Sequence, residues 1–304
     1  MPGVHPSMHR IASRSMIDMV LRTQPIRSLR FSQKGAIRMT MLFIALSLML
    51  FTISPASGET TADTQQPDRA ATVLITGSNR GIGFEFARQY AQKGWVVLAT
   101  ARRPGGADDL KALAAEYPNV KIERLDVTDP ATIEALAEKY RDHPIDVLIN
   151  NAGVLGDPAV QTLQDLEYET FTQVMTVNVF GALAVSQAFL EQVGASDQKK
   201  IVTITSSMGS LALTRSGNFY FYRISKAGVN MAMRTLQADV RDRGIIVTVL
   251  MPGAVATRML AQTGYRGPAL TPEESVTSLI KVIINLSPEQ AGTFLQYDGK
   301  TLPW

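Results

Sequence analysis

The feature that most constrains the fold is a regular alternation of apolar strand-like segments with helix-like segments from residue 70 onward. The strand-like segments lie at residues 72–76, 95–100, 120–125, 145–149, 201–205 and 245–250, with a seventh candidate at 293–297. The helix-like segments lie at residues 82–93, 107–116, 130–140, 167–191 and 219–241. Strands that are apolar throughout are typical of a parallel sheet covered by helices on both faces. The sequence therefore predicts an α/β fold with one doubly wound parallel sheet of six to seven strands, in a single domain over residues 70–304.

Residues 1–58 differ in character and are predicted to be a leader. Basic residues are frequent up to residue 38, and an apolar run of 13 residues follows at 41–53. This run is shorter than the ~20 residues of a membrane-spanning helix, but it suits the apolar core of a signal peptide. Small residues follow at Ala56, Ser57 and Gly58, so we expect an export signal that is cleaved near Ala56 or Gly58.

Two alternatives stay open for this leader. An uncleaved segment would anchor the protein to a membrane, and would be its only membrane contact. A misassigned start, with Met16, Met19 or Met39 as the true one, would leave a cytoplasmic protein instead of an exported or periplasmic one. Residues 59–69 are polar, contain Pro67 and are predicted to be a linker.

The formal net charge of +3 originates in the N-terminal segment. Residues 1–69 carry eight Lys and Arg against four Asp and Glu, which leaves 22 basic and 23 acidic residues for the remainder. A nearly neutral body without a basic stripe argues against nucleic-acid binding. The chain has no cysteine, and its histidines are His5 and His9 in the leader and His143 before a proline, so we expect no metal site.

A glycine-rich turn joins the first strand to the first helix. It consists of Gly77, Ser78, Asn79, Arg80, Gly81, Ile82 and Gly83. Glycines permit a tight turn and the close approach of a pyrophosphate, which the free N–H groups at a helix start can bind. The turn therefore indicates a dinucleotide-binding domain of the Rossmann type.

Preceded by Thr76, this turn resembles the fingerprint of the short-chain dehydrogenase/reductase family, and further motifs follow in the family's order. After the fourth strand, Asn150, Asn151, Ala152 and Gly153 match the Asn-Asn-Ala-Gly signature that flanks the cofactor. The resemblance covers residues 70–304. It implies an oxidoreductase that transfers hydride between NADP(H) and a small-molecule carbonyl or alcohol substrate.

The resemblance also implies four catalytic residues, which are Asn178, Ser207, Tyr222 and Lys226. In the family, the tyrosine protonates the carbonyl oxygen and the serine orients it. The lysine binds the nicotinamide ribose and tunes the tyrosine, and the asparagine helps to hold a proton-relay water.

The spacing of Tyr222 and Lys226 has a direct physical meaning, because residues four apart on a helix share one face. A nearby ammonium favours a phenolate, so we expect a pKa for Tyr222 below the usual value of about 10 and a role as general acid. Tyr220 is a rival phenol, but the residue four positions after it is Ile224.

The choice of serine is less direct than the choice of tyrosine. Ser207 lies two residues farther from Tyr222 than is usual in the family, which implies an insertion around residues 211–218. Ser206 therefore stays open as the second candidate.

The cofactor is predicted from Arg102, at the end of the second strand. NAD enzymes usually place an acid there against the ribose 2′-hydroxyl, whereas a guanidinium suits a 2′-phosphate, and Arg80 could join it. We expect NADP(H) to be preferred, with NAD(H) as the alternative. The resemblance implies further cofactor contacts from Asp126, Val127, Pro252, Gly253, Val255 and Thr257.

Residues 207–210, 222–227 and 297–304 resemble the branch of sniffer-type carbonyl reductases and C-factor proteins. In this branch residues 258–271 would form a mobile lid over the substrate. A second interpretation is an exported, C-factor-like signalling or regulatory protein that binds dinucleotide with little turnover. An extended nucleotide-sugar epimerase is disfavoured by the short C-terminal region. Family members often dimerise through the helices that would carry Asn178 and Tyr222, which makes a homodimer one expected assembly.

Overall fold

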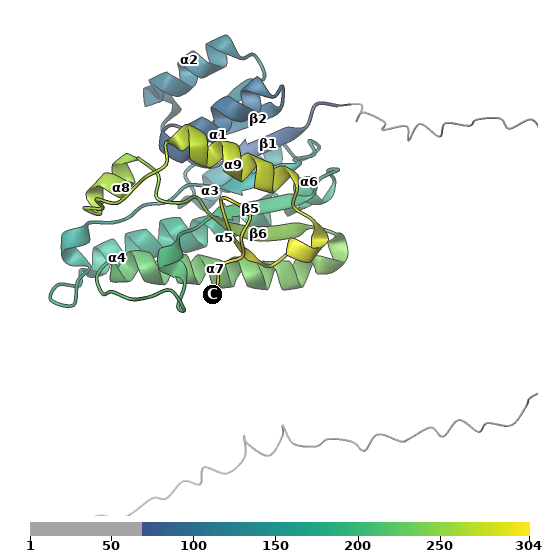
Figure 1. Ribbon diagram of the computed structural model, residues 1–304. Coiled ribbons are helices and arrows are strands. Elements are labelled where there is room, and N and C mark those ends of the chain that lie inside the picture. Colours follow the sequence, from purple (N-terminus) through teal and green to yellow (C-terminus); the bar gives the residue numbers. More distant parts are fainter. Residues whose placement is uncertain (1–68) are drawn as a thin grey trace, which may run out of the picture. The chain divides into compact units, whose positions relative to one another are not determined.

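A single seven-stranded parallel sheet forms the centre of the molecule in the computed structural model, which describes residues 69–304 (Figure 1). The strands are β1 (Thr72–Ile75), β2 (Val96–Ala101), β3 (Val120–Arg124), β4 (Val147–Asn150), β5 (Lys200–Ile204), β6 (Ile246–Met251) and β7 (Phe294–Gln296). Their order is β3-β2-β1-β4-β5-β6-β7, and every neighbouring pair is parallel. The predicted doubly wound α/β fold is confirmed, including the seventh strand. The order changes direction between β1 and β4, where open sheets of this kind bind ligands at their carboxyl edge.

Helices cover both faces of this sheet (Figure 1). The helices are α1 (Gly81–Gln92), α2 (Asp108–Glu116), α3 (Pro130–Lys139), α4 (Tyr168–Met175), α5 (Gly181–Ala188), α6 (Leu190–Gly194), α7 (Tyr220–Val240), α8 (Arg258–Gln262) and α9 (Pro272–Ile284). Apolar residues of α1, α2 and α9 pack on one face of the sheet, and those of α3, α5 and α7 pack on the other. Within β1, Val73 and Ile75 join the first layer while Leu74 joins the second, so both faces of the strand need apolar side chains.

Two helical regions differ from the sequence-based expectation. The long helix expected at residues 167–191 is interrupted by a π-helical turn, Thr176–Phe180, and ends at Ala188 before the short α6. The helix α9 was not predicted, although Thr271 and Glu274 form a capping box and Pro272 occupies the first turn. Both are common start signals of helices.

An ion pair fixes the start of the domain. Arg69 donates two hydrogen bonds to the Asp146 carboxylate, at 2.7 and 3.0 Å, and the Thr72 N–H donates to the same carboxylate at 2.8 Å. Asp146 is only 1% exposed. Arg69, the last residue of the predicted linker, is therefore attached to the domain.

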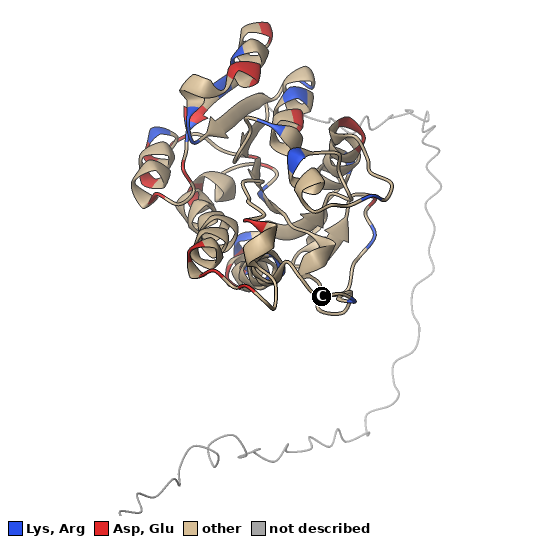
Figure 2. Cartoon of the chain, turned by 90° about the vertical axis from the view of Figure 1, so that its left-hand side faces the viewer, with Lys and Arg blue, Asp and Glu red and all other residues tan. Residues whose placement is uncertain are grey.

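The predicted leader at residues 1–58, with its predicted apolar core at 41–53, and the predicted linker up to residue 68 lie outside the described residues. Within residues 69–304 no helix is both long and apolar enough to cross a membrane. The same part of the chain holds no cluster of three or more His, Asp or Glu side chains suited to a metal ion. Figure 2 shows Lys and Arg mixed with Asp and Glu around the domain, with neither sign forming a continuous stripe in that view.

Candidate active site

The predicted site residues gather at the carboxyl edge of the sheet. The glycine turn follows β1, residues 151–153 follow β4, Ser206 follows β5 and residues 252–257 follow β6. Neighbouring parallel strands end at the same edge, so these turns surround one region. The helix α7 adds Tyr222 and Lys226, which are 8% and 6% exposed.

The glycine turn has the backbone that a dinucleotide-binding turn needs. Gly77 and Gly81 have φ values of +69° and +55°, in the left-handed region that favours glycine. A Cβ on Gly83 would lie 2.3 Å from both the Asn151 Nδ2 atom and the Gly77 carbonyl oxygen. Backbone conformation therefore favours glycine at positions 77 and 81. Close contact with the turn after β4 and with Gly77 leaves no room for a side chain at position 83.

The start of α1 is open toward the same edge. Arg80, at the N-cap position, provides no side-chain cap, so the first N–H groups of the helix are available to an anion. Arg80 and Asn79 lie at the surface or partly exposed, and Ile82 packs on the core. Ser78 is turned inward: its hydroxyl donates to the Ile75 carbonyl and its N–H to the Thr100 carbonyl, both at 2.8 Å. Its predicted cofactor contact therefore has no free donor in this structure.

The turn after β4 is fastened to the glycine turn through Thr76. The Thr76 hydroxyl accepts the N–H groups of Asn151 and Ala152, each at 2.9 Å. The Asn151 amide donates to the carbonyls of Thr76 and Gly77. The Asn-Asn-Ala-Gly segment therefore acts first as a structural brace. Gly153 faces the catalytic side, where a Cβ would lie 3.6 Å from the Lys226 Nζ atom.

Arg102 lies exposed just beyond β2, close to Asp126 after β3. Burial tends to raise the pKa of Asp126, but hydrogen bonds from Thr128 and the positive charges of Arg102 and Arg124 lower it overall. Val127 is buried and packs tightly against Gly181, since a Cβ added to Gly181 would collide with the Val127 side chain. An exposed guanidinium beside the end of β2 fits the 2′-phosphate of a dinucleotide.

The segment after β6 closes the other side of this region. Pro252 is buried and Gly253 has φ +86°, whereas Val255 pairs with Leu270. Thr257 caps α8 by accepting from the Leu260 N–H, and its methyl group would lie 3.6 Å from a Cβ on Gly81. The turns after β1 and β6 therefore approach each other closely, and these residues together fit a bound dinucleotide.

Tyr222 and Lys226 lie together, but their pKa values depart from the sequence-based expectation. The Lys226 Nζ atom is 5.7 Å from the centre of the Tyr222 ring and donates to the Ile204 carbonyl at 3.0 Å. Burial raises the pKa of Tyr222 to about 12, and burial lowers the pKa of Lys226 to about 8. The expected lowering for Tyr222 is corrected, because burial disfavours both charged forms.

The two serine candidates occupy different positions. The Ser206 hydroxyl accepts the Met208 N–H at 3.1 Å, and its effect on the Tyr222 phenol is to lower the pKa of Tyr222 in opposition to burial. Ser207 begins a short helical turn, and among residues 69–304 its side chain makes no hydrogen bond. Ser206, the last extended residue after β5, is thus the serine that acts on the pKa of the phenol, and the choice between Ser206 and Ser207 stays a prediction.

Asn178 lies in the π-helical turn, 2% exposed. Its side-chain oxygen accepts the Val154 N–H, while its amide donates to the Val154 carbonyl and the Ser225 hydroxyl, at 2.8 to 2.9 Å. The side chain is therefore occupied by protein groups. Both amide hydrogens are used, so any water that Asn178 organises would have to bind its side-chain oxygen or its main chain.

Two residues beside Tyr222 were not singled out from the sequence. Met259, in α8, places its sulfur 3.9 Å from the Tyr222 hydroxyl, so the predicted lid reaches the phenol. Gln161, between β4 and α4, accepts the Tyr222 N–H at 3.1 Å through its side-chain oxygen. A loop glutamine so far from Tyr222 in sequence carries no local signal that would identify it.

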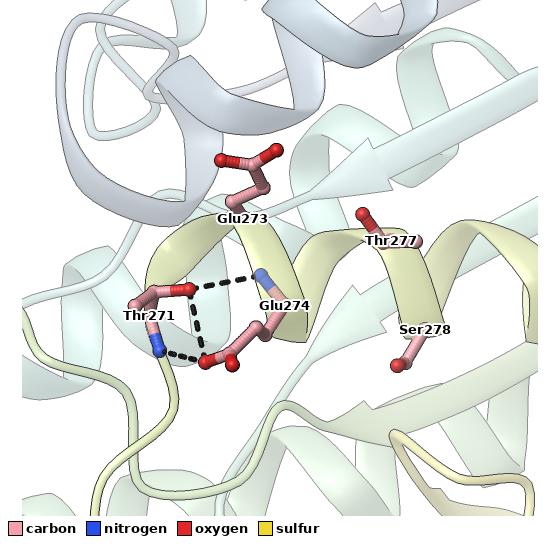
Figure 3. A pocket seen from close by; sticks show the side chains of 5 residues that line it. All are labelled: Thr271, Glu273, Glu274, Thr277 and Ser278. Carbon is pink, nitrogen blue, oxygen red and sulfur yellow. Dashed lines mark hydrogen bonds between the residues drawn. The ribbon is translucent and has the colours of Figure 1, made fainter.

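A separate hollow lies at the start of α9 and contains none of the predicted site residues (Figure 3). It is lined by Thr271, Glu273, Glu274, Thr277 and Ser278. The Thr271 hydroxyl and N–H bond to Glu274, as the dashed lines show. The polar groups of Thr271 and Glu274 are therefore used in capping the helix, and the Thr277 hydroxyl donates to Gln89.

Comparison with known proteins agrees with this geometry. The sequence profile described as short chain dehydrogenase matches residues 71–266. NADPH-bound carbonyl reductase from chicken fatty liver is 35% identical, with a TM-score of 0.71 over 78% of this chain and all of that chain. The carbonyl reductase Sniffer of D. melanogaster is 25% identical, with a TM-score of 0.70 over the same shares.

A relative of smaller size is the C-signal protein of Myxococcus xanthus. It is 38% identical over 172 residues, which are 57% of this chain and all of that protein. The predicted resemblance to sniffer-type reductases and C-factor proteins is thereby confirmed, and the chain belongs to the short-chain dehydrogenase family.

Proposed function

We propose that this oxidoreductase reduces small carbonyl compounds with NADPH and that Tyr222 is the proton donor. The observation that carries the proposal is the meeting of Tyr222, Ser206 and Lys226 beside an open glycine turn at one edge of the sheet. The NADPH-bound carbonyl reductase from chicken, at 35% identity, supports the choice of cofactor. Arg102 and Arg80 would hold the 2′-phosphate.

Each polar group has a defined task in this reaction. The cofactor supplies a hydride to the carbonyl carbon when it is bound. Tyr222 stays protonated at neutral pH because burial raises its pKa to about 12, so it has a proton to donate to the carbonyl oxygen. Ser206 would orient that oxygen through its hydroxyl, and Lys226 would hold the ribose of the cofactor and supply positive charge below about pH 8.

Carbonyl reduction needs the protonated form of Tyr222, which is the form present at neutral pH. Oxidation needs a phenolate to accept the alcohol proton, and burial disfavours that charged form. Asn178 acts as a positioning residue that joins the π-helical turn to α7 through Ser225.

The test is oxidation of NADPH and NADH by the purified protein with a panel of aldehydes, ketones and quinones. We expect turnover that prefers NADPH and falls at least about 1,000-fold in Tyr222→Phe, because the proton donor is removed. Tyr220→Phe is the matched control and should keep near-normal turnover. Full turnover in Tyr222→Phe would contradict the assignment.

A signalling role is the second candidate, favoured by the 38% identity to C-signal. Dinucleotide binding without turnover on any panel member would support this role over the reductase.

The homodimer also remains a prediction. The helices α4 and α7 carry exposed apolar residues such as Tyr168 and Met231, at 73% and 66% exposed.

A further inference from the structure

Gln161 joins three segments around Tyr222 although its side chain is completely buried. Its side-chain amide donates to the carbonyls of Leu155 and Asp157, at 2.9 and 3.1 Å. Its side-chain oxygen accepts the Tyr222 N–H at 3.1 Å, and its main-chain carbonyl accepts the Tyr220 N–H at 3.2 Å. One residue in a loop thus bonds two N–H groups in the first turn of α7.

This contact replaces a missing local cap. The N-cap residue of α7 is Phe219, which provides no side-chain hydrogen bond and has φ +54°, and Asn218 before it has φ +66°. Left-handed backbone at residues other than glycine is uncommon and costs energy. A helix start needs acceptors for its first N–H groups. The Gln161 oxygen occupies the place that a serine or aspartate side chain takes at an ordinary N-cap.

The loop residues around Gln161 pack closely against its side chain. Gly156 has φ +77°, and a Cβ there would lie 3.2 Å from the Gln161 amide nitrogen and 2.7 Å from a methyl group of Val174. Leu155 and Gly156 directly follow Val154, whose N–H and carbonyl are held by Asn178. A continuous set of hydrogen bonds therefore runs from the π-helical turn through the loop after β4 to Tyr222.

We propose that Gln161 is a positioning residue. By serving as a remote N-cap of α7, it fixes where the Tyr222 hydroxyl lies relative to the substrate. The proposal deepens the proposed reductase function and rests on it for its effect on turnover. A misplacement of about 1 Å at a reacting group can reduce turnover about 100-fold. Loss of the cap allows the first turn of α7 to fray, which displaces the phenol while leaving the dinucleotide turn intact.

The experiment compares Gln161→Met with Gln237→Met. Gln237 is the matched control because its side chain also bridges two backbone groups, Ile245 and Val247, from the other end of α7. Gln161→Met should lower kcat about 10- to 100-fold while the Kd for NADPH stays within about twofold of the original, whereas Gln237→Met should lower Tm alone. Gln161→Glu keeps an acceptor for the Tyr222 N–H and should retain more turnover than Gln161→Met.

Hydrogen exchange of a peptide over residues 219–226 supplies a readout independent of turnover. Gln161→Met should speed exchange in this peptide, and Gln237→Met should not. Unchanged exchange together with unchanged kcat in Gln161→Met, or equal kcat losses in both methionine variants, would overturn the proposal. A protein without turnover on any substrate would refute the reductase function, and the exchange data would still decide whether Gln161 caps α7.

Discussion

The glycine turn and the catalytic pair lie at the same edge of the sheet but are built differently. The turn depends on backbone shape and on the absence of side chains at Gly77, Gly81 and Gly83. The pair depends on side chains from separate segments, because Tyr222 contacts Ser206 after β5, Met259 in α8 and Gln161 after β4. The glycine turn, the first construction, is determined by a short stretch of sequence. The surroundings of Tyr222, the second construction, form only when distant segments of the chain fold together.

Apart from the loss of Tyr222 itself, the largest expected effect tests the side chains that meet at Tyr222. Ser206→Ala should lower kcat about 100- to 1,000-fold, because it removes a hydrogen-bond donor at the oxygen where charge develops. Ser207→Ala is the matched control and should change kcat less than about threefold. Steady-state kinetics with one good aldehyde substrate would measure both variants. A larger loss in Ser207→Ala would restore the original prediction.

The next-largest effect tests the glycine turn, the first construction. Gly83→Ala places a methyl group 2.3 Å from the Asn151 amide and the Gly77 carbonyl, so the two turns must separate. We expect a loss of about 3 kcal/mol in stability or in NADPH binding, at the upper end of what overpacking costs. Titration of NADPH fluorescence and thermal unfolding would measure this. Gly217→Ala, where nothing lies within 4 Å of the added carbon, is the control. Equal behaviour of the two variants would contradict the tight approach of the turns.

Lys226→Met tests how much the burial of the Lys226 ammonium lowers the unfolding free energy of the domain. Burial lowers the pKa of Lys226 to about 8 from 10.5, so the unfolded chain binds more protons than the folded chain between these pH values. The cost of burying the ammonium is thus fully present below about pH 8 and disappears as pH rises toward 10.5. The variant should gain roughly 2 kcal/mol in unfolding free energy at pH 7, with a smaller gain at pH 10. Denaturant unfolding at both pH values checks this, and a gain that is independent of pH would contradict it.

The smallest effect concerns cofactor choice at the end of β2. Arg102→Asp should lower the ratio of kcat/KM for NADPH to that for NADH about 10-fold, because a carboxylate repels the 2′-phosphate. Arg103→Asp is the matched control, since Arg103 is also exposed but is not among the charges that act on Asp126. Equal or better use of NADH by the unmutated protein would refute the NADP(H) preference.

The sequence was sufficient for most of the sheet because strands buried on both faces must be largely apolar, and β1, β2, β4 and β6 show this directly. The edge strand β3 differs, since Lys121 and Arg124 are exposed. The sequence pattern missed α9 and the interruption of the helix at Thr176–Phe180. The interruption contains Asn178, which bonds to Val154 in a distant segment. A periodic apolar pattern does not reveal such a contact.

The site divides in the same way. The spacing of Tyr222 and Lys226 on one helix identified the pair, but the direction of the Tyr222 pKa depends on how deeply α7 is buried. The choice between Ser206 and Ser207 depends on the direction in which each side chain leaves the end of β5. Gln161 and Met259 approach Tyr222 from loops whose paths no local pattern determines.

The contact of Arg69 with Asp146 defines how far the chain can be trimmed. Asp146 is a buried carboxylate at the start of β4, and Arg69 is the residue that offsets its charge from outside the strands. Removal of the chain up to residue 68 would leave this contact in place, whereas one further residue would strip a buried anion of its partner. A chain that begins at residue 59, after the predicted leader, would therefore keep this contact.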